Sequence, residues 1–258
     1  MKQISIIIAT YNASKTIERC LDSIVLQMTD ETELIIIDGG SSDSTLQLLK
    51  KYKDKIERII SEEDKGIYDA WNKGIKLANG NWIMFVGADD ILLPNALSVY
   101  LCTLSTIAEI GAYDYICAHN DYVDKCGVLL KVMGNPPTWR KMKYMMAAAH
   151  VASLHSKKNL FESIGGYDLN FKICADYELL LRKRNKLKYL MLDSHIAQME
   201  VGGMSFSTKA IVETYRIRKM HHCLPLFVNE LFLFRDWIAY RLFILRKKYI
   251  QGGILSIL

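Results

Sequence analysis

Two adjacent aspartates end the stretch "WIMFVGADD", residues 82–90, directly after a short and continuous apolar run. Such a run is typical of a strand that is buried on both faces. A hard divalent cation that also binds phosphate oxygens needs one or two fixed carboxylates from the protein. We therefore interpret Asp89 and Asp90 as a candidate metal site, and the alternative is a helix N-cap ahead of "ILLPNAL" (91–97).

Two further polar clusters follow apolar runs, namely "TYN" at residues 10–12 and "DGGSSDS" at residues 38–44. Short polar side chains and glycines allow backbone amides to approach a base, a ribose or a phosphate closely. Asp38, at the exit of its run, is placed to accept a hydrogen bond from the imide N–H of a nucleobase. A nucleotide site is one interpretation of these clusters, and ordinary loop formation is the alternative, which is the more common case for either cluster alone.

A third group of candidates lies in "ADYELLLR", residues 175–182, where Asp176 and Glu178 stand near the start of a predicted helix. A carboxylate in this position can remove a proton from an attacking hydroxyl group, and a helix N-cap is the alternative. His150 and His155 flank a predicted strand, where each is either a hydrogen-bonded structural histidine or a functional one. The six histidines show no zinc-ligand spacing.

The elements that must position these residues alternate in the first part of the chain. Apolar runs predict strands over 4–10, 33–38, 58–61 and 82–87. Helical spacing predicts a helix over 14–27 that Ser14 caps, a second helix that begins at about residue 45, and a third over 67–78. This alternation predicts an α/β fold with right-handed crossovers and a parallel sheet. Ligands bind at the carboxyl ends of such strands, so the polar clusters are expected to meet there.

After residue 110 the pattern is less regular. Strands are predicted over 113–119 and 127–133 around a turn, and another over 147–156, followed by a helix over 176–185.

The charge of the 258-residue chain is unevenly distributed. Its net charge is +5, and the segment from Ser205 onward carries nine Lys and Arg against three acidic residues, so the remainder is close to neutral. A neutral body with a basic tail argues against a nucleic-acid-binding protein and suits an anionic membrane surface.

The C-terminal stretch 226–249 is apolar and aromatic, but charges such as Glu230 and Arg241 interrupt it too often for a membrane span. It is predicted either to pack on the domain or to bind at a membrane interface. With no apolar leader ahead of "ISIIIAT", we expect a cytoplasmic protein whose six cysteines are reduced.

The ordered set "SIIIATYN", "IIIDGGSSDST", "DKGIYDAWNKGI", "FVGADD", "GGYD" and "ADYELLLR" resembles glycosyltransferase family 2, the inverting transferases of GT-A fold. The subgroup it looks most like makes bacterial O-antigen, capsular and colanic-type polysaccharides. The resemblance covers about residues 3–207. It implies a Rossmann-like, mostly parallel sheet flanked by helices in a domain over 1–207, with a basic helical extension over 208–258.

The resemblance also implies roles for individual residues. It implies donor contacts from the first polar loops, a divalent cation (Mn²⁺ or Mg²⁺), a carboxylate base, and a histidine near the acceptor. The family often has Glu before the base, where this chain has Ala175, and "GGMS" (202–205) matches a recurring glycine turn. By position the donor residues are Thr10, Asn12, Asp38, Lys65, Gly66 and Asp89, the metal residues are Asp90 and Asp89, the base is Asp176, and the acceptor residue is His150.

The implied activity is transfer of a sugar from a nucleotide-diphospho-sugar, expected to be a UDP-hexose, to a polyprenyl-diphosphate-linked oligosaccharide. The enzyme is expected to be peripheral on the inner face of the bacterial cytoplasmic membrane. One alternative is a non-catalytic nucleotide-sugar-binding module, against which the intact Asp90 and Asp176 argue. Another is a sugar nucleotidyltransferase, for which "TYNAS" is not the expected basic, Gly-rich phosphate loop.

Overall fold

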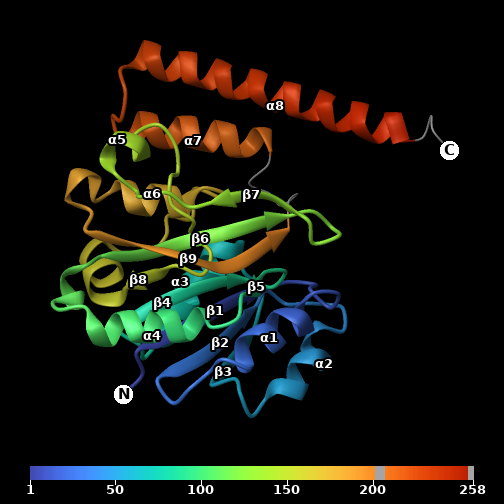
Figure 1. Cartoon of the computed structure of the whole chain (residues 1–258), viewed down its shortest axis with the longest axis vertical. Coiled ribbons are helices and arrows are strands. Elements are labelled where there is room, and N and C mark those ends of the chain that lie inside the picture. Colours follow the sequence, from blue (N-terminus) through green and yellow to red (C-terminus); the bar gives the residue numbers. More distant parts are fainter. Residues whose placement is uncertain (201–206, 255–258) are drawn as a thin grey trace.

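The computed structural model describes residues 1–200 and 207–254, with side chains described as far as residue 244. One sheet with helices on both faces forms the body of the molecule (Figure 1). Its strands are β1 (Ile4–Thr10), β2 (Thr32–Asp38), β3 (Arg58–Ser61), β4 (Trp82–Gly87), β5 (Ile91–Leu92), β6 (Tyr115–Val123), β7 (Leu129–Met133), β8 (Leu154–Ser156) and β9 (Tyr189–Glu200). The strand order is β3-β2-β1-β4-β8-β6-β9-β5, with β7 paired to β6.

The helices alternate with the strands in the first half of the chain and gather at its end. They are α1 (Ile17–Val25), α2 (Thr45–Leu49), α3 (Ile67–Leu77), α4 (Ala96–Thr106), α5 (Trp139–Met142), α6 (Ala175–Leu181), α7 (Thr208–Met220) and α8 (Leu226–Ile254). Short 3-10 and π-helical segments are η1 (Lys50–Tyr52), η2 (Ile110–Ala112), η3 (Lys157–Glu162) and η4 (Arg184–Lys186). The predicted α/β fold is confirmed.

The first four strands are parallel, as the alternating pattern predicts. Thr10 lies opposite Asp38, Asp38 lies opposite Ser61, and Ala9 lies opposite Gly87. The polar ends of these strands therefore meet at one edge of the sheet, which is where parallel sheets bind ligands.

Strands β1, β2 and β4 are mostly apolar and buried because helices cover both of their faces, whereas β3 at the sheet edge is largely exposed. Ile6 and Ile8 of β1 pack with Leu21 of α1, whereas Ile7 packs on the opposite face with Trp71 of α3. All three isoleucines are fully buried. Burial of each such side chain stabilises the fold by about 1.5–3 kcal/mol.

The predicted cap at Ser14 is wrong. Helix α1 begins at Ile17, and the backbone N–H of Ser14 instead donates to Asp43 Oδ2 at 3.2 Å. The residues between β1 and α1 are thus used to join this loop to the one after β2, and they do not begin the helix.

The second half of the sheet is mixed, and here the sequence pattern is less informative. The strand predicted over 147–156 is shortened to β8, because Ala152 adopts a left-handed backbone conformation (φ 57°) that a strand cannot continue through. Strands β5 and β9 were not predicted. In β9 only Ile196 and Ala197 are fully buried, so its residues lack a simple alternation.

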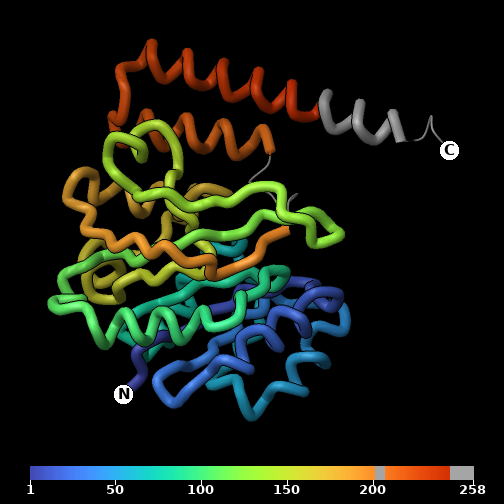
Figure 2. The backbone as a smooth tube through the Cα atoms, in the orientation of Figure 1, coloured from blue at the N-terminus to red at the C-terminus, as the bar shows by residue number. Residues whose placement is uncertain are grey.

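The two C-terminal helices lie at one end of the molecule, where α7 lies against the body and α8 runs alongside α7 on its far side (Figure 1 and Figure 2). Ala210 and Ile217 of α7 are buried, and Ile217 belongs to the same apolar cluster as Trp71. Helix α7 therefore packs on the sheet domain, while the division at residues 207 and 208 stays a prediction. As the sequence predicts for α8, none of the described helices combines the length and apolarity needed to cross a membrane.

Candidate active site

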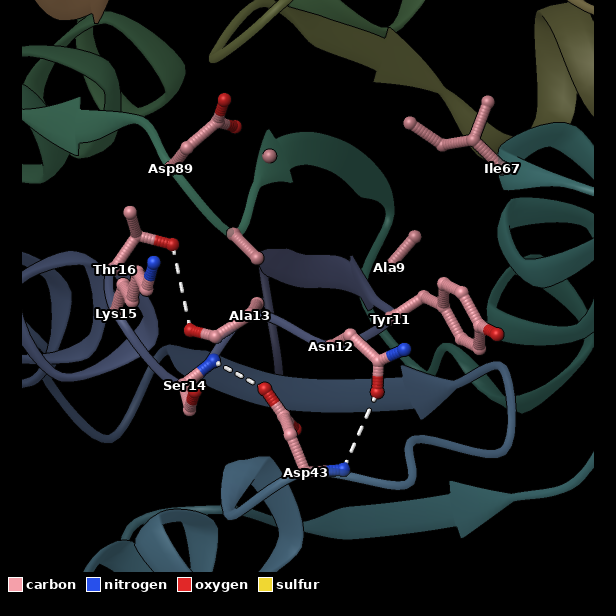
Figure 3. Close-up of a pocket in the computed structure, with 12 residues that line it drawn as sticks. Ala9, Tyr11, Asn12, Ala13, Ser14, Lys15, Thr16, Asp43, Ile67 and Asp89 are labelled. Carbon is pink, nitrogen blue, oxygen red and sulfur yellow. Dashed lines mark hydrogen bonds between the residues drawn. The ribbon is translucent and has the colours of Figure 1, made fainter.

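An open depression of about 540 Å³ lies at the carboxyl edge of β1 and β4 (Figure 3). The loop after β1 forms one wall, the end of β4 forms another, and Ile67 at the start of α3 faces them. The lining residues are Ala9, Tyr11, Asn12, Ala13, Ser14, Lys15, Thr16, Asp43, Ile67, Gly87, Ala88 and Asp89. The depression thus joins residues of three polar clusters that the sequence singles out, at the predicted edge of the sheet.

Asn12 shapes the first wall. Its backbone is left-handed (φ 49°), a conformation that asparagine tolerates well. Its Oδ1 accepts hydrogen bonds from the backbone N–H groups of Ser42 at 2.9 Å and Asp43 at 3.3 Å (Figure 3 shows the second). The side chain of Asn12 therefore fixes the loops after β1 and β2 to each other beside the depression.

The neighbouring residues Thr10 and Tyr11 differ in how far their side chains are exposed to solvent. Thr10 is buried, does not line the depression, and its hydroxyl has no hydrogen-bond partner among the described residues. Tyr11 is 65% exposed and lines the depression (Figure 3). Sequence reasoning missed Tyr11, although a large aromatic side chain between two small polar ones in a strand-end loop was an available signal.

Asp38 is fully buried beneath the loop after β2. Its carboxylate accepts hydrogen bonds from the N–H groups of Gly40 and Ser41 at 3.1 and 2.9 Å, and from the hydroxyls of Ser41 and Ser61 at 2.5 and 2.7 Å. In this structure both oxygens hold the loop and tie it to β3. The contact of Asp38 with a nucleobase stays a prediction.

Asp89 lines the depression and Asp90 is buried behind it. The backbone N–H of Gly87 donates to Asp90 Oδ2 at 2.9 Å. A Cβ on Gly87 would lie 2.6 Å from Asp90 Oδ2 and 2.9 Å from Asp89 Oδ1, so oxygens of both carboxylates converge over this glycine. The N-cap alternative is wrong, because α4 begins only at Ala96, beyond β5.

The electrostatics of this pair fit a cation. Burial, together with the charge of Asp89, raises the pKa of Asp90 to about 7. The guanidinium of Arg19 donates to the carbonyl oxygen of Asp89 at 3.0 Å, and among the described residues it pairs with Glu200 and not with either of these carboxylates. Among the described residues no group of three or more His, Cys, Asp or Glu gathers to hold a metal. The protein thus offers two carboxylates and leaves the other coordination positions to a ligand or water.

Lys65 and Gly66 form the turn into α3. Gly66 has a φ of 115°, which favours glycine, and its N–H donates to Asp64 Oδ1 at 2.8 Å. The ammonium group of Lys172 donates to the carbonyl oxygen of Lys65 at 3.1 Å. This turn therefore contacts the segment that leads into α6.

Asp176 is the second residue of α6 and accepts a hydrogen bond from the Tyr68 hydroxyl at 3.0 Å. The same hydroxyl lies 2.6 Å from the carbonyl oxygen of Ile173. Asp176 keeps part of its surface exposed, yet the surrounding protein removes enough water to raise the pKa of its carboxyl to about 6. The N-cap position belongs to Cys174, so Asp176 does not cap the helix.

Glu178, the other acid of this motif, is engaged elsewhere. Its buried carboxylate forms a bidentate ion pair with Arg182 and a hydrogen bond with His221 Nε2 at 2.9 Å. Burial alone would raise the pKa of Glu178, but the hydrogen bonds from His221 and Arg182 outweigh it and lower the pKa. This carboxylate joins α6 to α7 and is not free to take up a proton from a substrate.

Tyr122 of β6 lies within electrostatic reach of both candidate carboxylates. Burial raises the pKa of Tyr122 to about 12, and the charges of Asp90 and then Asp176 add to that rise. Sequence reasoning missed Tyr122, since nothing in "NDYVDK" distinguishes it from an ordinary strand residue.

His150 and His155 lie in the aromatic part of the core. His150 stacks on Trp71 at 5.1 Å between ring centroids, and its Nε2 lies 2.9 Å from the Tyr167 hydroxyl. Burial lowers the pKa of His150 to about 3, so the ring is neutral. His155 is fully buried, with Nδ1 at 3.3 Å from the carbonyl oxygen of Ile83. Both histidines are thus packed inside the protein, and the acceptor role of His150 stays a prediction. The "GGMS" turn that the sequence also singles out lies outside the described residues.

Comparison with known proteins places this geometry in context. The family model described as "Glycosyl transferase family 2" matches residues 5–151. A "PGL/p-HBAD biosynthesis glycosyltransferase" of Mycobacterium tuberculosis is 30% identical over 210 residues, which cover 78% of this chain and 78% of that protein. Chondroitin synthase of Escherichia coli is 29% identical over 184 residues, 69% of this chain and 26% of that protein.

Two solved structures share the fold. TarS (residues 1–349) of S. aureus, in complex with UDP-GlcNAc, superposes with a TM-score of 0.68 at 20% identity, covering 90% of this chain and 70% of that one. The mannosyltransferase PcManGT from Pyrobaculum calidifontis, in complex with GDP-Man and Mn²⁺, superposes with a TM-score of 0.63 at 14% identity, covering 99% and 81%. At these identities the likeness shows the GT-A-type fold alone.

Proposed function

This chain belongs to glycosyltransferase family 2, and we propose that it is an inverting, metal-dependent transferase that uses a nucleotide-diphospho-sugar. One observation carries the proposal. Ile67 lines the depression, and the next residue, Tyr68, donates a hydrogen bond to Asp176. Asp176 does not itself line the depression, and we propose that its carboxyl group, whose pKa is raised, faces the same site as Asp89 and Asp90.

The donor nucleotide is proposed to lie in the depression. The exposed ring of Tyr11 offers a flat surface on which a base can stack, and Asn12 orders the loop beside it. Thr10, Asp38, Lys65 and Gly66 are proposed to complete the donor site. A UDP-hexose is favoured by the UDP-GlcNAc complex of TarS, although PcManGT, which shares the fold, holds GDP-Man.

Asp90 and Asp89 are proposed to hold Mn²⁺ or Mg²⁺ through the oxygens that converge over Gly87. When bound, such a cation neutralises the diphosphate and makes it a better leaving group. Asp90 also shapes this wall of the depression, because its carboxylate accepts the hydrogen bond from the N–H of Gly87 at the end of β4.

Asp176 is proposed to act as the general base. With a pKa of about 6 it is ionised at neutral pH and still basic enough to accept a proton from the acceptor hydroxyl. The hydroxyl oxygen then bonds to the anomeric carbon from the face opposite the diphosphate, and the bond from that carbon to the diphosphate oxygen breaks. One such displacement inverts the configuration through an oxocarbenium-like transition state.

The acceptor is proposed to be a polyprenyl-diphosphate-linked oligosaccharide of bacterial surface polysaccharide synthesis, reached at the inner face of the cytoplasmic membrane. The basic C-terminal segment supports a location at an anionic surface. His150, buried on Trp71, is proposed to support the acceptor side from within the core.

The proposal is tested by measuring the melting temperature of the protein with a panel of nucleotide sugars, with Mn²⁺ or with chelator. We expect one donor to stabilise the protein only when the cation is present. Transfer to a hydroxyl acceptor should then be lost in Asp176→Asn, which should keep the thermal shift. Full transfer by Asp176→Asn would refute the base, and a shift that survives chelator would refute the metal.

A further inference from the structure

Helix α8 exposes a row of large apolar side chains. Phe227, Leu231, Phe234 and Leu242 are 60–70% exposed, and Ile238 is 39% exposed. With 3.6 residues per turn, these five positions fall within an arc of about 80° on the helix. We call these five residues the apolar stripe.

The opposite side of α8 is fixed to α7. Asn229 is buried, and its amide donates to the carbonyl oxygen of Tyr215 at 3.2 Å. Phe232 stacks on Tyr144 with ring centroids 5.0 Å apart, and the guanidinium of the fully buried Arg218 lies over the Phe232 ring at 5.6 Å. The helix is therefore apolar on two sides, one covered by the domain and one left exposed, which explains why its sequence does not look amphipathic.

The charges of α8 are sorted between these sides. Glu230 accepts a hydrogen bond from the Tyr215 hydroxyl at 2.5 Å, and Asp236 lies 3.5 Å from Arg218, so both acids are engaged with α7. Arg241 lies over the exposed Trp237 ring at 4.7 Å, beside the apolar stripe. The sequence adds Arg246, Lys247 and Lys248 after the last described side chain. Both acids are thus bonded to α7, although Glu230 remains exposed, and Arg241, for which the described residues offer no ion-pair partner, borders the stripe.

We infer that the apolar stripe of α8 docks on an anionic lipid surface, with the helix lying in the plane of the interface. An apolar face bordered by Trp and Arg suits the boundary between acyl chains and negatively charged headgroups. The inference rests on the proposed lipid-linked acceptor only for the identity of the membrane. That the bound surface is lipid and anionic follows from the exposure of the apolar stripe and from the positions of the charged side chains on α8.

The test is sedimentation of the full-length protein with vesicles that contain no acceptor, made either of phosphatidylglycerol and phosphatidylcholine or of phosphatidylcholine alone. We expect binding to the anionic vesicles, weakened by salt because part of the attraction is screened. The double variant Leu231→Ser, Ile238→Ser should bind about tenfold more weakly or worse, since each side chain contributes through its buried apolar area. The matched control is Val212→Ser, which changes a half-exposed valine of α7 outside the stripe and should bind like the wild type.

Circular dichroism establishes that each variant is folded. A folded double variant that sediments like the wild type would overturn the inference. A wild-type protein that does not bind anionic vesicles would also overturn the inference. If the wild type then elutes as a dimer and the double variant elutes as a monomer, the stripe joins two copies of this chain instead. Transfer to a water-soluble acceptor is measured separately. If the wild type binds vesicles but transfers no sugar, only the proposed function is refuted. If the wild type transfers sugar but does not bind vesicles, only the docking inference is refuted.

Discussion

The hydroxyl group of Tyr68 offers a sharp test of the proposed base. It is buried and donates to Asp176 Oδ1 at 3.0 Å while also lying 2.6 Å from the carbonyl oxygen of Ile173. The substitution Tyr68→Phe removes this donor and leaves the ring in place. The ring should keep its edge-on contact with Trp71, whose centroid lies 5.4 Å away, so the packing changes little.

The expected direction follows from the protonation state that acts. Burial raises the pKa of Asp176 to about 6, and the hydrogen bond from Tyr68 opposes that rise because it stabilises the carboxylate. A base works only when deprotonated, so activity is present above this pKa and is lost as the pH falls through it. Without the hydroxyl, the pKa rises further and the acid limb of the pH–rate profile moves toward neutral pH.

The magnitude follows from the strength of one shared hydrogen bond. Hydrogen bonds to charged groups contribute about 1.5–3 kcal/mol, and the lower end applies because Ile173 competes for the same proton. One pKa unit corresponds to about 1.4 kcal/mol, so the acid limb should move by about one unit, to a midpoint of about 7.

The assay is kcat/KM for sugar transfer between about pH 5 and pH 9. The control is Tyr167→Phe, which removes the hydroxyl of a neighbouring buried tyrosine that is hydrogen-bonded to His150 and, among the described residues, not to Asp176. It should leave the acid limb where it is. If Tyr68→Phe lowers the rate equally at every pH, the hydroxyl has a structural role only and the reasoning is refuted.

Three other outcomes are expected. Asp176→Asn should lower kcat by roughly 10²–10⁴-fold in transfer assays while donor binding by calorimetry is retained, and a near-normal kcat would move the base elsewhere. Tyr11→Ala should weaken donor binding by about tenfold, as loss of one stacking contact does, and an unchanged Kd would place the base of the nucleotide away from this ring. A chain that ends after residue 224 should no longer bind anionic vesicles. It should also melt at a lower temperature, because α8 covers Arg218 and pairs with it through Asp236. An unchanged melting temperature by circular dichroism would contradict that packing.

The first half of the fold could be predicted from the sequence because β1, β2 and β4 are buried on both faces, while the short and largely exposed β3 was marked by its two isoleucines. Residues such as Ile7 and Ile8 pack on opposite sides of one sheet, and the short, β-branched apolar run between polar loops favours a buried strand over a helix. Strand β9 carries no such signal. It pairs with β6 and β5, yet it is only partly covered, and its polar residues such as Asp193 and His195 conceal the pattern.

The candidate site shows a similar limit. The position of Asp89 and Asp90 beside the depression follows from their place at a strand end. The hydrogen bonds within the loops do not follow from sequence, since the pattern "DGGSSDS" says nothing of which group Asp38 will bind. The exposure of Tyr11 and the burial of Thr10 depend on which way one loop turns, which is decided by its contacts with Ser42 and Asp43.

The C-terminal helices bear directly on the site, although their sequence suggests a separate extension. Glu213 of α7 accepts hydrogen bonds from the N–H groups of residues 172–174, at 2.8 to 2.9 Å, and these residues lead directly to Asp176. Helix α8 packs on the same α7 through Asn229. If the apolar stripe rests on a membrane, α7 connects that surface to the loop that carries the proposed base. The height of Asp176 above the lipid would then be fixed by two packed helices, which is what a hydroxyl group on a membrane-bound acceptor requires.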